Sequence, residues 1–374
     1  MNSYTLKEVT NKKELAAMID LPWKLYANDP NWVPPLKMAV HDLFKPKHPF
    51  YETSELKSWM AEDAEGNICG RIIAVVNDHY NKFHEQKIGF FGFFEAENNS
   101  FLAKTLFDAA EGWLKDKGMT SVLGPMNPST NYECGTLVEG FEDPPQIMMT
   151  YNPEYHKDLI EGCGYAKAKD LIAYNIEIEK ALPDSFKRIT ERIERSKKIS
   201  YRTANKKDWQ KEVDLMLEVY NDAWEKNWGF VPMTEAEFRH TANDLKQVVD
   251  ENLIIFAEID GDTAGFVVGL PDLNQVFKKI PSGKLLPFGI FKLLNYKKHV
   301  DRMRVPTMGV KRKYHKLGLA ALLLTRIQEA AHRDPNYHFC EASWILEDNL
   351  NMNKPLIKMG GIPYKTYRIF EKNL

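Results

Sequence analysis

The order of predicted helices and strands occurs twice along the 374 residues. In each half, short strands separated by polar turns precede a long amphipathic helix, a further strand, a second helix and a closing strand. An offset of 197 residues also aligns identical residues, namely Asn152 with Asn349, Lys157 with Lys354, Leu159 with Leu356, Ile160 with Ile357 and Gly164 with Gly361. The repetition predicts a duplicated fold, with domains at 1–180 and 200–374 and a connecting helix at 181–199.

Both halves mix strands and helices, which is typical of the α/β class. The strand signals at 70–76 and 87–95 are short, rich in β-branched or aromatic residues and bounded by polar turns. The helix expected at 101–117 has apolar residues at helical spacing and ends before Gly118. We therefore expect each domain to hold a mixed sheet flanked by helices.

The composition argues against several classes of protein. Fifty Lys and Arg against fifty-two Asp and Glu leave a net charge of −2, so the overall charge does not indicate nucleic-acid binding. The longest uncharged apolar run, 317–325, is far shorter than the roughly 20 residues of a membrane-spanning helix, and residues 1–5 do not resemble a signal peptide. The cysteines and histidines form no metal-binding motif. We expect a cytoplasmic protein without a metal, and the oligomeric state is not indicated.

The segment 310–320 carries the clearest indication of chemistry. It leads from an expected strand into an Ala/Leu-rich helix, and five of the six residues at 311–316 are Lys, Arg or His. The first turn of a helix exposes unpaired N–H groups at the positive end of the helix dipole, so it attracts phosphate groups. Gly318 would let a ligand approach the backbone closely. The alternative interpretation is a basic turn in front of a buried helix.

This segment resembles the pyrophosphate-binding loop of the GNAT superfamily of acyl-CoA-dependent N-acyltransferases. That loop has Gln or Arg, two residues, Gly, one residue and Gly or Ala, and His315, Gly318 and Ala320 take these positions, with His as a departure. The resemblance extends over 200–374 in element order and implies acetyl-CoA or a longer acyl-CoA as co-substrate. The implied coenzyme-binding residues are Val310, His315, Lys316, Leu317, Gly318, Leu319, Ala320 and Asn349.

The matching loop of the first half, 96–101, has no glycine and contains Glu97. A carboxylate at this place would repel a pyrophosphate group. The resemblance therefore implies two GNAT-like domains in tandem, of which the first has lost its coenzyme site and the second has kept it.

The resemblance also implies direct attack of an amine on the acyl thioester. In GNAT enzymes, backbone N–H groups at the end of the fourth strand hold the thioester carbonyl and its oxyanion, and the matching residues are Met308, Gly309 and Val310. We expect Glu341 on the next strand to be the base, with a solvated or ion-paired strand residue as the alternative. The tyrosine acid of many members is replaced by Leu356.

A second polar segment is the loop at 124–135 of the first half. In an extended conformation alternate residues share one face, which would group Asn127, Ser129, Asn131 and Glu133. Such a group would orient an amine or a hydroxyl head group at the boundary between the domains, so these residues are candidates for acceptor binding. Local hydrogen bonding by Asn and Ser within the loop is the alternative.

The third segment, 271–301, stands where a GNAT fold has a tight hairpin. It contains six lysines among many large apolar residues. This combination is typical of a segment that contacts a membrane surface or a long-chain substrate. A lid that packs on the sheet with its lysines at the wet edge is the alternative.

Together these features favour an acyl-CoA-dependent N-acyltransferase that transfers an acetyl or longer acyl group to a primary amine. The insert and the 12% of aromatic residues favour a lipid-like acceptor, such as a sphingoid base, over a small amine. The unusual His315 and the absent tyrosine leave two alternatives open. One is a non-catalytic protein that binds acyl-CoA or a partner, and the other is a structural protein with two inactive halves.

Overall fold

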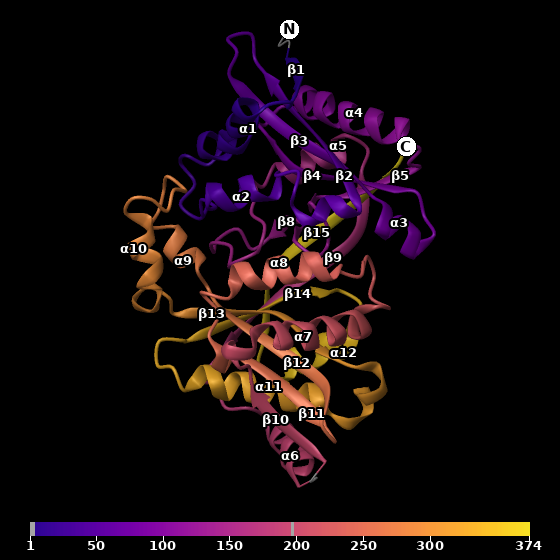
Figure 1. The fold of residues 1–374 in the computed structure, drawn as a ribbon. Coiled ribbons are helices and arrows are strands. Elements are labelled where there is room, and N and C mark those ends of the chain that lie inside the picture. Colours follow the sequence, from indigo (N-terminus) through magenta and orange to yellow (C-terminus); the bar gives the residue numbers. More distant parts are fainter. Residues whose placement is uncertain (1–3, 196–197) are drawn as a thin grey trace. The chain divides into compact units, whose positions relative to one another are not determined.

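The computed structural model describes residues 4–195 and 198–374, and the chain divides into two compact units (Figure 1). The first unit contains residues 1–171, 277–294 and 365–374, and the second contains 172–276 and 295–364. This division differs from the expected domain boundaries, because most of the insert and the last residues of the chain belong to the first unit. The segment expected as a connecting helix contains α6 (Asp184–Glu194), which is part of the second unit, and its residues 196–197 lie outside the described residues.

The sheet of the first unit has the order β1-β2-β3-β4-β5, with every neighbour antiparallel except the parallel pair β4/β5. Its strands are β1 (Thr5–Glu8), β2 (Ser54–Glu62), β3 (Ile68–Asn77), β4 (Ile88–Ala96), β5 (Ser121–Gly124), β6 (Met126–Asn127), β7 (Glu133–Cys134) and β8 (Thr136–Glu139). Its helices are α1 (Lys12–Leu25), α2 (Lys37–Leu43), the 3₁₀ turn η1 (Pro49–Glu52), α3 (Asp78–His84), α4 (Ser100–Asp116), α5 (His156–Gly162) and α10 (Gly289–Leu294). Strands β9 (Ala166–Glu177) and β15 (Ile362–Asn373) contain residues of both units.

Helices cover both faces of β3, which is why almost every residue of that strand is buried. The even-numbered residues, such as Ile72, pack with α4, whereas Arg71 on the other face donates to the carbonyl of Met18 in α1. Residues at the N-termini of α1 and α4 cap both helices. Asn11 and Glu14 form a capping box at α1, and the Asn99 side chain accepts from the first turn of α4.

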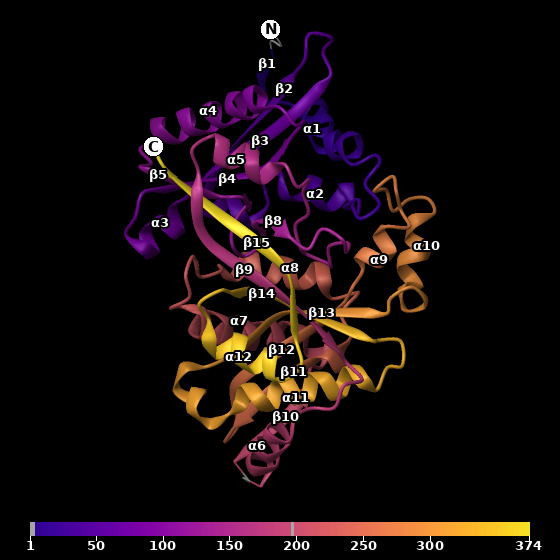
Figure 2. The same ribbon diagram turned by 180° about the vertical axis from the view of Figure 1, so that it is seen from behind.

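The second unit repeats this arrangement, with the sheet order β10-β11-β12-β13-β14 and one parallel pair, β13/β14. Its strands are β10 (Ile199–Thr203), β11 (Ile254–Ile259), β12 (Asp262–Pro271), β13 (Arg302–Val310) and β14 (Phe339–Leu346). Its remaining helices are η2 (Lys206–Asp208), α7 (Trp209–Trp224), α8 (Glu235–Leu245), η3 (Glu251–Leu253), α9 (Asn274–Phe277), η4 (Tyr296–Lys298), η5 (Arg312–Leu317), α11 (Leu319–His332) and α12 (Leu350–Lys358). Figures 1 and 2 show α7 and α11 on opposite faces of this sheet.

The two units therefore share one topology, in which a long helix connects the two parallel strands. In the first unit α4 connects β4 to β5, and in the second α11 connects β13 to β14. The expected α/β class, with a mixed sheet flanked by helices, is confirmed. Within residues 4–195 and 198–374, no helix combines the length and the apolar character that crossing a membrane requires.

One expected helix start is wrong. The pair Asn152-Pro153 predicts a helix with Asn152 as its N-cap and Pro153 at its first position, but α5 begins at His156, behind Tyr155. The Asn152 side chain instead accepts from the N–H of Leu137 at 2.7 Å and donates to its carbonyl at 3.1 Å. The residues around an Asn can be the same whether its side chain caps a helix or bonds to the backbone of another segment. Only the contact with the distant Leu137 shows which role Asn152 has.

Candidate functional site

The parallel strands β13 and β14 of the second unit separate after four paired positions. The last pair is Val305 with Ala342, and the next residue of β13 is Pro306. Proline has no N–H and cannot continue the ladder toward β14. A pocket of about 560 Å³ lies at this point, and both strands line it.

The walls of this pocket are mainly apolar and come from helices on both faces of the sheet. The residues that form them include Ile176 of β9, Trp224 of α7, Ala320 and Leu324 of α11, and Leu356 and Met359 of α12. A concave site of this size with few polar groups is typical of a small-molecule pocket.

Backbone groups of β13 face the side on which β14 has separated. The N–H of Lys311 donates to the carbonyl of Ala264 in the adjacent chain at 2.8 Å, and the register pairs Val310 with Gly265. Because alternate residues of an antiparallel strand bond to the same neighbour, Gly309 points its N–H toward β12, whereas Met308 and Val310 point theirs away from it. Met308 and Val310 are therefore the backbone donors on the open side.

His315 fixes the end of this strand. Its Nε2 lies 2.8 Å from the carbonyl oxygen of Val310. Since a carbonyl only accepts, His315 donates through Nε2 and carries its proton there. Both residues line the pocket.

Gly318 stands at the start of α11 with a φ of +84°. This left-handed conformation favours glycine, and a Cβ atom would lie only 3.0 Å from Cγ2 of Ile189 in α6. The carbonyl of Gly318 accepts the first helical bonds from Ala321 and Leu322, so the N–H groups of Leu319 and Ala320 have no partner within the helix. The helix terminus thus has the geometry that attracts an anion.

The basic residues before Gly318 are largely engaged in ion pairs. Lys311 is buried and lies 2.6 Å from Glu218 and 2.9 Å from Asp262. Lys313 lies 2.8 Å from Asp262, and these hydrogen bonds, with that from Lys313 the strongest, hold the pKa of the Asp262 carboxyl well below its usual range. Arg312 pairs with two acidic side chains at the end of α7. These three residues fasten the loop to α7 and β12, so the run of like charge is not a free phosphate-binding cluster.

Most of the expected coenzyme residues line the pocket. Those that do are Val310, His315, Lys316, Ala320 and Asn349, together with Met308 and Gly309. Leu317, Gly318 and Leu319 are not among its lining residues, and the side chain of Leu319 lies in the core. Asn349 is the N-cap residue of α12 but makes no capping bond with its side chain in the described structure, and it lines the pocket instead.

Glu341 lies at the centre of a buried polar cluster. Its carboxylate is fully buried, and Nε of Arg304 is 3.6 Å away from one of its oxygens. The hydroxyl groups of Ser343 and Tyr364 each donate to one oxygen of Glu341. Arg304 also donates through Nε to Oγ of Ser343 at 2.8 Å.

Glu341 itself does not line the pocket, but Ser343 does. The Glu341 carboxylate is therefore connected to the pocket through the Ser343 hydroxyl, and its role as the base stays a prediction. The sequence contained a signal for this residue, because positions two apart on a strand share one face. Nothing local indicated that Arg304 and Tyr364 complete the cluster.

Two further residues limit the chemistry of the pocket. Burial raises the pKa of the Cys340 thiol to about 12, so Cys340 is a protonated thiol at neutral pH, although it lines the pocket. Leu356, at the position of the expected tyrosine, is fully buried and also lines the pocket. Cys340 is therefore not a thiolate nucleophile, and Leu356 has no acidic group.

In the first unit the chain itself occupies the corresponding gap between β4 and β5. A Cβ atom at Gly92 of β4 would lie 1.8 Å from the carbonyl oxygen of Met126 in β6. The Asn127 side chain accepts from the N–H of Phe93 at 2.7 Å. This close packing supports the expectation that the first unit has no coenzyme site, because backbone takes the space that a ligand would need.

The loop at 124–135 does not have the extended conformation in which its alternate residues would share one face. Its ends form the short antiparallel pair β6/β7, in which Asn127 lies opposite Glu133, and the chain turns between them. Ser129 accepts through Oγ from the N–H of Asn131 at 3.2 Å, as the alternative of local hydrogen bonding described. These four residues belong to the first unit and the pocket belongs to the second, so their role in acceptor binding stays a prediction.

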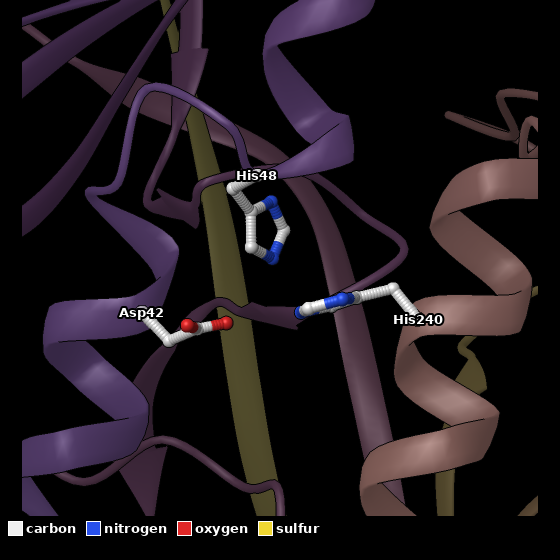
Figure 3. Close-up of side chains that lie close together, drawn as sticks. All are labelled: Asp42, His48 and His240. Atoms are coloured by element: carbon white, nitrogen blue, oxygen red, sulfur yellow. The ribbon is translucent and has the colours of Figure 1, made fainter.

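Figure 3 draws Asp42 and His48 of the first unit together with His240 of α8 in the second. Each has a role within its own unit. Asp42 accepts from Lys45 at 2.6 Å, His48 accepts through Nδ1 from the N–H of Phe50 at 3.2 Å, and His240 lies 3.6 Å from Asp244. Two side chains of one unit do not make a metal site, so we assign none to them.

Comparisons with known proteins give relatives over almost the whole chain. The chain is 40% identical over 376 residues to a protein named bacterial ceramide synthase from Caulobacter vibrioides, and the match covers 98% of this chain and 96% of that protein. It is 36% identical over 371 residues to the protein YghO of Escherichia coli, covering 97% and 94% of the two chains. No protein-family model matches the chain.

Two solved structures resemble the chain over almost its whole length. A tandem GNAT protein from the clavulanic acid biosynthesis pathway gives a TM-score of 0.59 at 12% identity, covering 99% of this chain and 98% of that one. A GCN5-related N-acetyltransferase from Sphaerobacter thermophilus gives 0.55 at 13% identity, covering 99% and 95%. At these identities the likeness concerns the fold, and it confirms the expected tandem GNAT architecture.

Proposed function

Because the chain belongs to the family of the bacterial ceramide synthase of Caulobacter vibrioides, we propose that it is an acyl-CoA-dependent N-acyltransferase whose acceptor is a long-chain amino alcohol. The observation that carries this proposal is the apolar pocket at the separation of β13 and β14. It combines open backbone donors, a helix terminus and an apolar wall within one unit. The corresponding gap of the first unit is filled by Met126 and Asn127.

The pocket fits an acyl thioester with a phosphorylated carrier. The start of α11 offers the unpaired N–H groups of Leu319 and Ala320 to a pyrophosphate, and the exposed Lys316 adds a positive charge beside them. The N–H groups of Met308 and Val310 face the open side of β13, where they can donate to the thioester carbonyl oxygen. The apolar residues of α11 and α12 then suit an acyl chain.

The reaction is attack of the amine nitrogen on the thioester carbonyl. The nitrogen lone pair forms the new C–N bond, the carbonyl oxygen becomes an oxyanion, and the C–S bond then breaks to release the thiolate. Backbone N–H groups of Met308 and Val310 stabilise the oxyanion. The amine must also lose one proton, which the Ser343 hydroxyl accepts while its own proton passes to the Glu341 carboxylate.

Arg304 and Tyr364 hold this relay in position. Arg304 donates to Ser343 and keeps the carboxylate charge of Glu341 compensated, and Tyr364 occupies its second oxygen. The remaining Glu341 oxygen is therefore directed at Ser343. With Leu356 in place of an acid, the thiolate leaves without a side-chain donor at that position and takes its proton from solvent.

The acceptor is inferred from a relative of the chain and not from the residues of the pocket. The name of the 40% identical relative connects that protein with ceramide, which is an N-acylated sphingoid base. A primary amine with a neighbouring hydroxyl and a long alkyl chain is thus the acceptor class that we propose here. The expected cytoplasmic location stays a prediction.

The test is an acyl-transfer assay with the full-length protein. Palmitoyl-CoA is supplied with either sphinganine or serinol, a short amino alcohol with the same head group, and free CoA thiol and N-acyl product are measured. We expect thiol release that depends on sphinganine, with stoichiometric amide product. Release without any amine, or an equal rate with serinol, would contradict the proposed acceptor. Acyl-CoA binding without any release would support the non-catalytic alternative, which the missing tyrosine favours.

A further inference from the structure

The central part of the insert, residues 277–294, forms a surface of the first unit that the proposed reaction does not use. Two hydrogen bonds fasten it to that unit. Trp23 donates through Nε1 to the carbonyl of Pro281 at 2.7 Å, and the N–H of Lys37 donates to the carbonyl of Gly283 at 2.9 Å. The segment is therefore a fixed part of the first unit, and Figures 1 and 2 show its helix α10 at the outer edge of that unit, beyond α2.

Large apolar side chains on this segment are turned toward solvent. Leu286, Phe288, Phe291 and Leu294 are 74%, 75%, 61% and 72% exposed. They are four of the twelve exposed large apolar side chains identified in the described structure, and they fall within nine residues. Single exposed apolar residues are ordinary, but a group of this kind marks an interaction surface.

The charge of the segment has one sign. Residues 277–294 contain four lysines and no acid, and the acid-free stretch extends from 273 to 300. Asp and Glu number 52 in the 374 residues, so a stretch of that length would on average contain about four. Lys278, Lys279, Lys284 and Lys292 are all exposed and lie among the apolar side chains of the segment.

We propose that residues 277–294, the docking surface, bind an anionic membrane by inserting their apolar side chains at headgroup depth. Phe and Leu side chains gain free energy at the boundary of the acyl chains, while lysines reach back to the lipid phosphates with their long stems. Each lysine close to an anionic surface strengthens binding about fivefold. Helix α10 has six residues, so it lies on the membrane and does not span it.

The composition favours a membrane over a protein partner. The buried centre of a protein interface is rich in Tyr, Trp and Arg and poor in Lys. The docking surface has none of the first three residue types and four of the last. Its pattern of Phe, Leu and Lys is that of interfacial membrane segments.

The test is flotation of the full-length protein with vesicles. Wild-type protein is expected to float with vesicles of equal parts phosphatidylglycerol and phosphatidylcholine, and much less with phosphatidylcholine alone. Lys278→Gln with Lys284→Gln should weaken binding to the anionic vesicles about 25-fold. Phe288→Ser with Leu294→Ser should weaken it on the order of 100-fold, because two exposed apolar groups lose their insertion. Salt at about 0.5 M should remove most of the charge-dependent part.

Matched controls exist elsewhere on the first unit. Phe101→Ser changes a side chain that is 57% exposed on α4, and Lys115→Glu reverses an exposed charge on the same helix. Both should float as wild type does. The proposal is overturned if wild-type protein does not bind anionic vesicles at low salt, or if the controls weaken binding as much as the double variants. Flotation needs no turnover, so failure of this proposal and failure of the proposed reaction are separate results.

Discussion

Replacing Glu341 by Gln tests whether the buried cluster serves the reaction or only the fold. Glu341 is fully buried and Arg304 is 4% exposed, so the substitution leaves a guanidinium without its counter-charge in the protein interior. Gln also presents an amide N–H₂ to hydroxyl groups that now donate to a carboxylate. Breaking a buried ion pair on one side costs about 3–5 kcal/mol. For a unit of this size that corresponds to a melting temperature lower by roughly 6–20 °C.

A second substitution separates the two roles of Glu341. In Glu341→Gln with Arg304→Met the unpaired charge is absent, so calorimetry should give a melting temperature within a few degrees of wild type. Turnover in the CoA-release assay should nevertheless stay at least about 100-fold below wild type, because the proton acceptor is missing. If the double variant regains both stability and turnover, Glu341 is structural and the proposed relay is wrong.

The same unit provides a control for this experiment. Glu212 is also buried and forms two hydrogen bonds with Arg202, at 2.7 and 3.0 Å. Glu212→Gln should lower the melting temperature by a smaller amount, because Arg202 is one-third exposed and keeps its 2.7 Å ion pair with Glu258, while kcat of the protein that remains folded stays close to wild type. A selective loss of kcat in Glu212→Gln would show that stability and turnover are coupled throughout the unit.

Three further predictions concern single sites. Gly318→Asp should weaken acyl-CoA binding by roughly 100-fold in a calorimetric titration, because the carboxylate repels the pyrophosphate. Gly318→Asn introduces a side chain of the same shape as Asp without the charge and tolerates positive φ, so it should weaken binding far less. Equal losses of affinity in the two variants would mean that charge at this position does not matter. Ser343→Ala should lower kcat about 100-fold with little change in KM for acyl-CoA, and a change in KM alone would assign Ser343 to binding. Burial raises the pKa of Glu95 from 4.5 to about 7 and lowers that of His156 from 6.5 to about 4. Between about pH 5 and 6.5 the folded chain therefore carries one proton on Glu95, and the unfolded chain carries one proton on His156. The pair thus binds one proton in both states, and its effect on stability changes little with pH in this range. In His156→Gln only Glu95 remains, so above about pH 4.5 the folded state holds a proton that the unfolded state has lost. The free energy of unfolding, measured in urea titrations, should therefore fall by roughly 3 kcal/mol from pH 4.5 to 7. A rise over this range would contradict the assignment.

Elements with local signals were predicted from the sequence with small errors at their ends. The helix expected at 101–117 is α4, Ser100–Asp116, because its capping residue and its apolar spacing are both local. The sequence predicts a strand at 305–310, and the observed strand β13 begins three residues earlier, at Arg302. Helix α1 was not predicted, although Asn11 and Glu14 form a capping box in front of it. Pro22 inside that helix obscures the pattern.

The parts that the sequence did not reveal depend on contacts between distant residues. The loop before Gly318 was correctly recognised as the entrance to a helix, but Glu218 and Asp262, which neutralise Lys311, lie far away in the chain. The insert falls within the range expected for the second domain, 200–374, yet Pro281 accepts a hydrogen bond from Trp23 of the first unit. Hydrophobic periodicity indicates which face of a helix or strand is buried, but it does not indicate which other element packs against that face.

The most direct test of the central claim is a calorimetric titration of the full-length protein with decanoyl-CoA below its micelle concentration. The account predicts one binding site per chain, since the pocket at β13 and β14 is open and the corresponding gap at β4 and β5 is filled by Met126. A stoichiometry of one in the wild-type protein, with affinity weakened by roughly 100-fold in Gly318→Asp, is the expected result. Two sites per chain would contradict the loss of the first site, and no binding at all would contradict the coenzyme pocket itself.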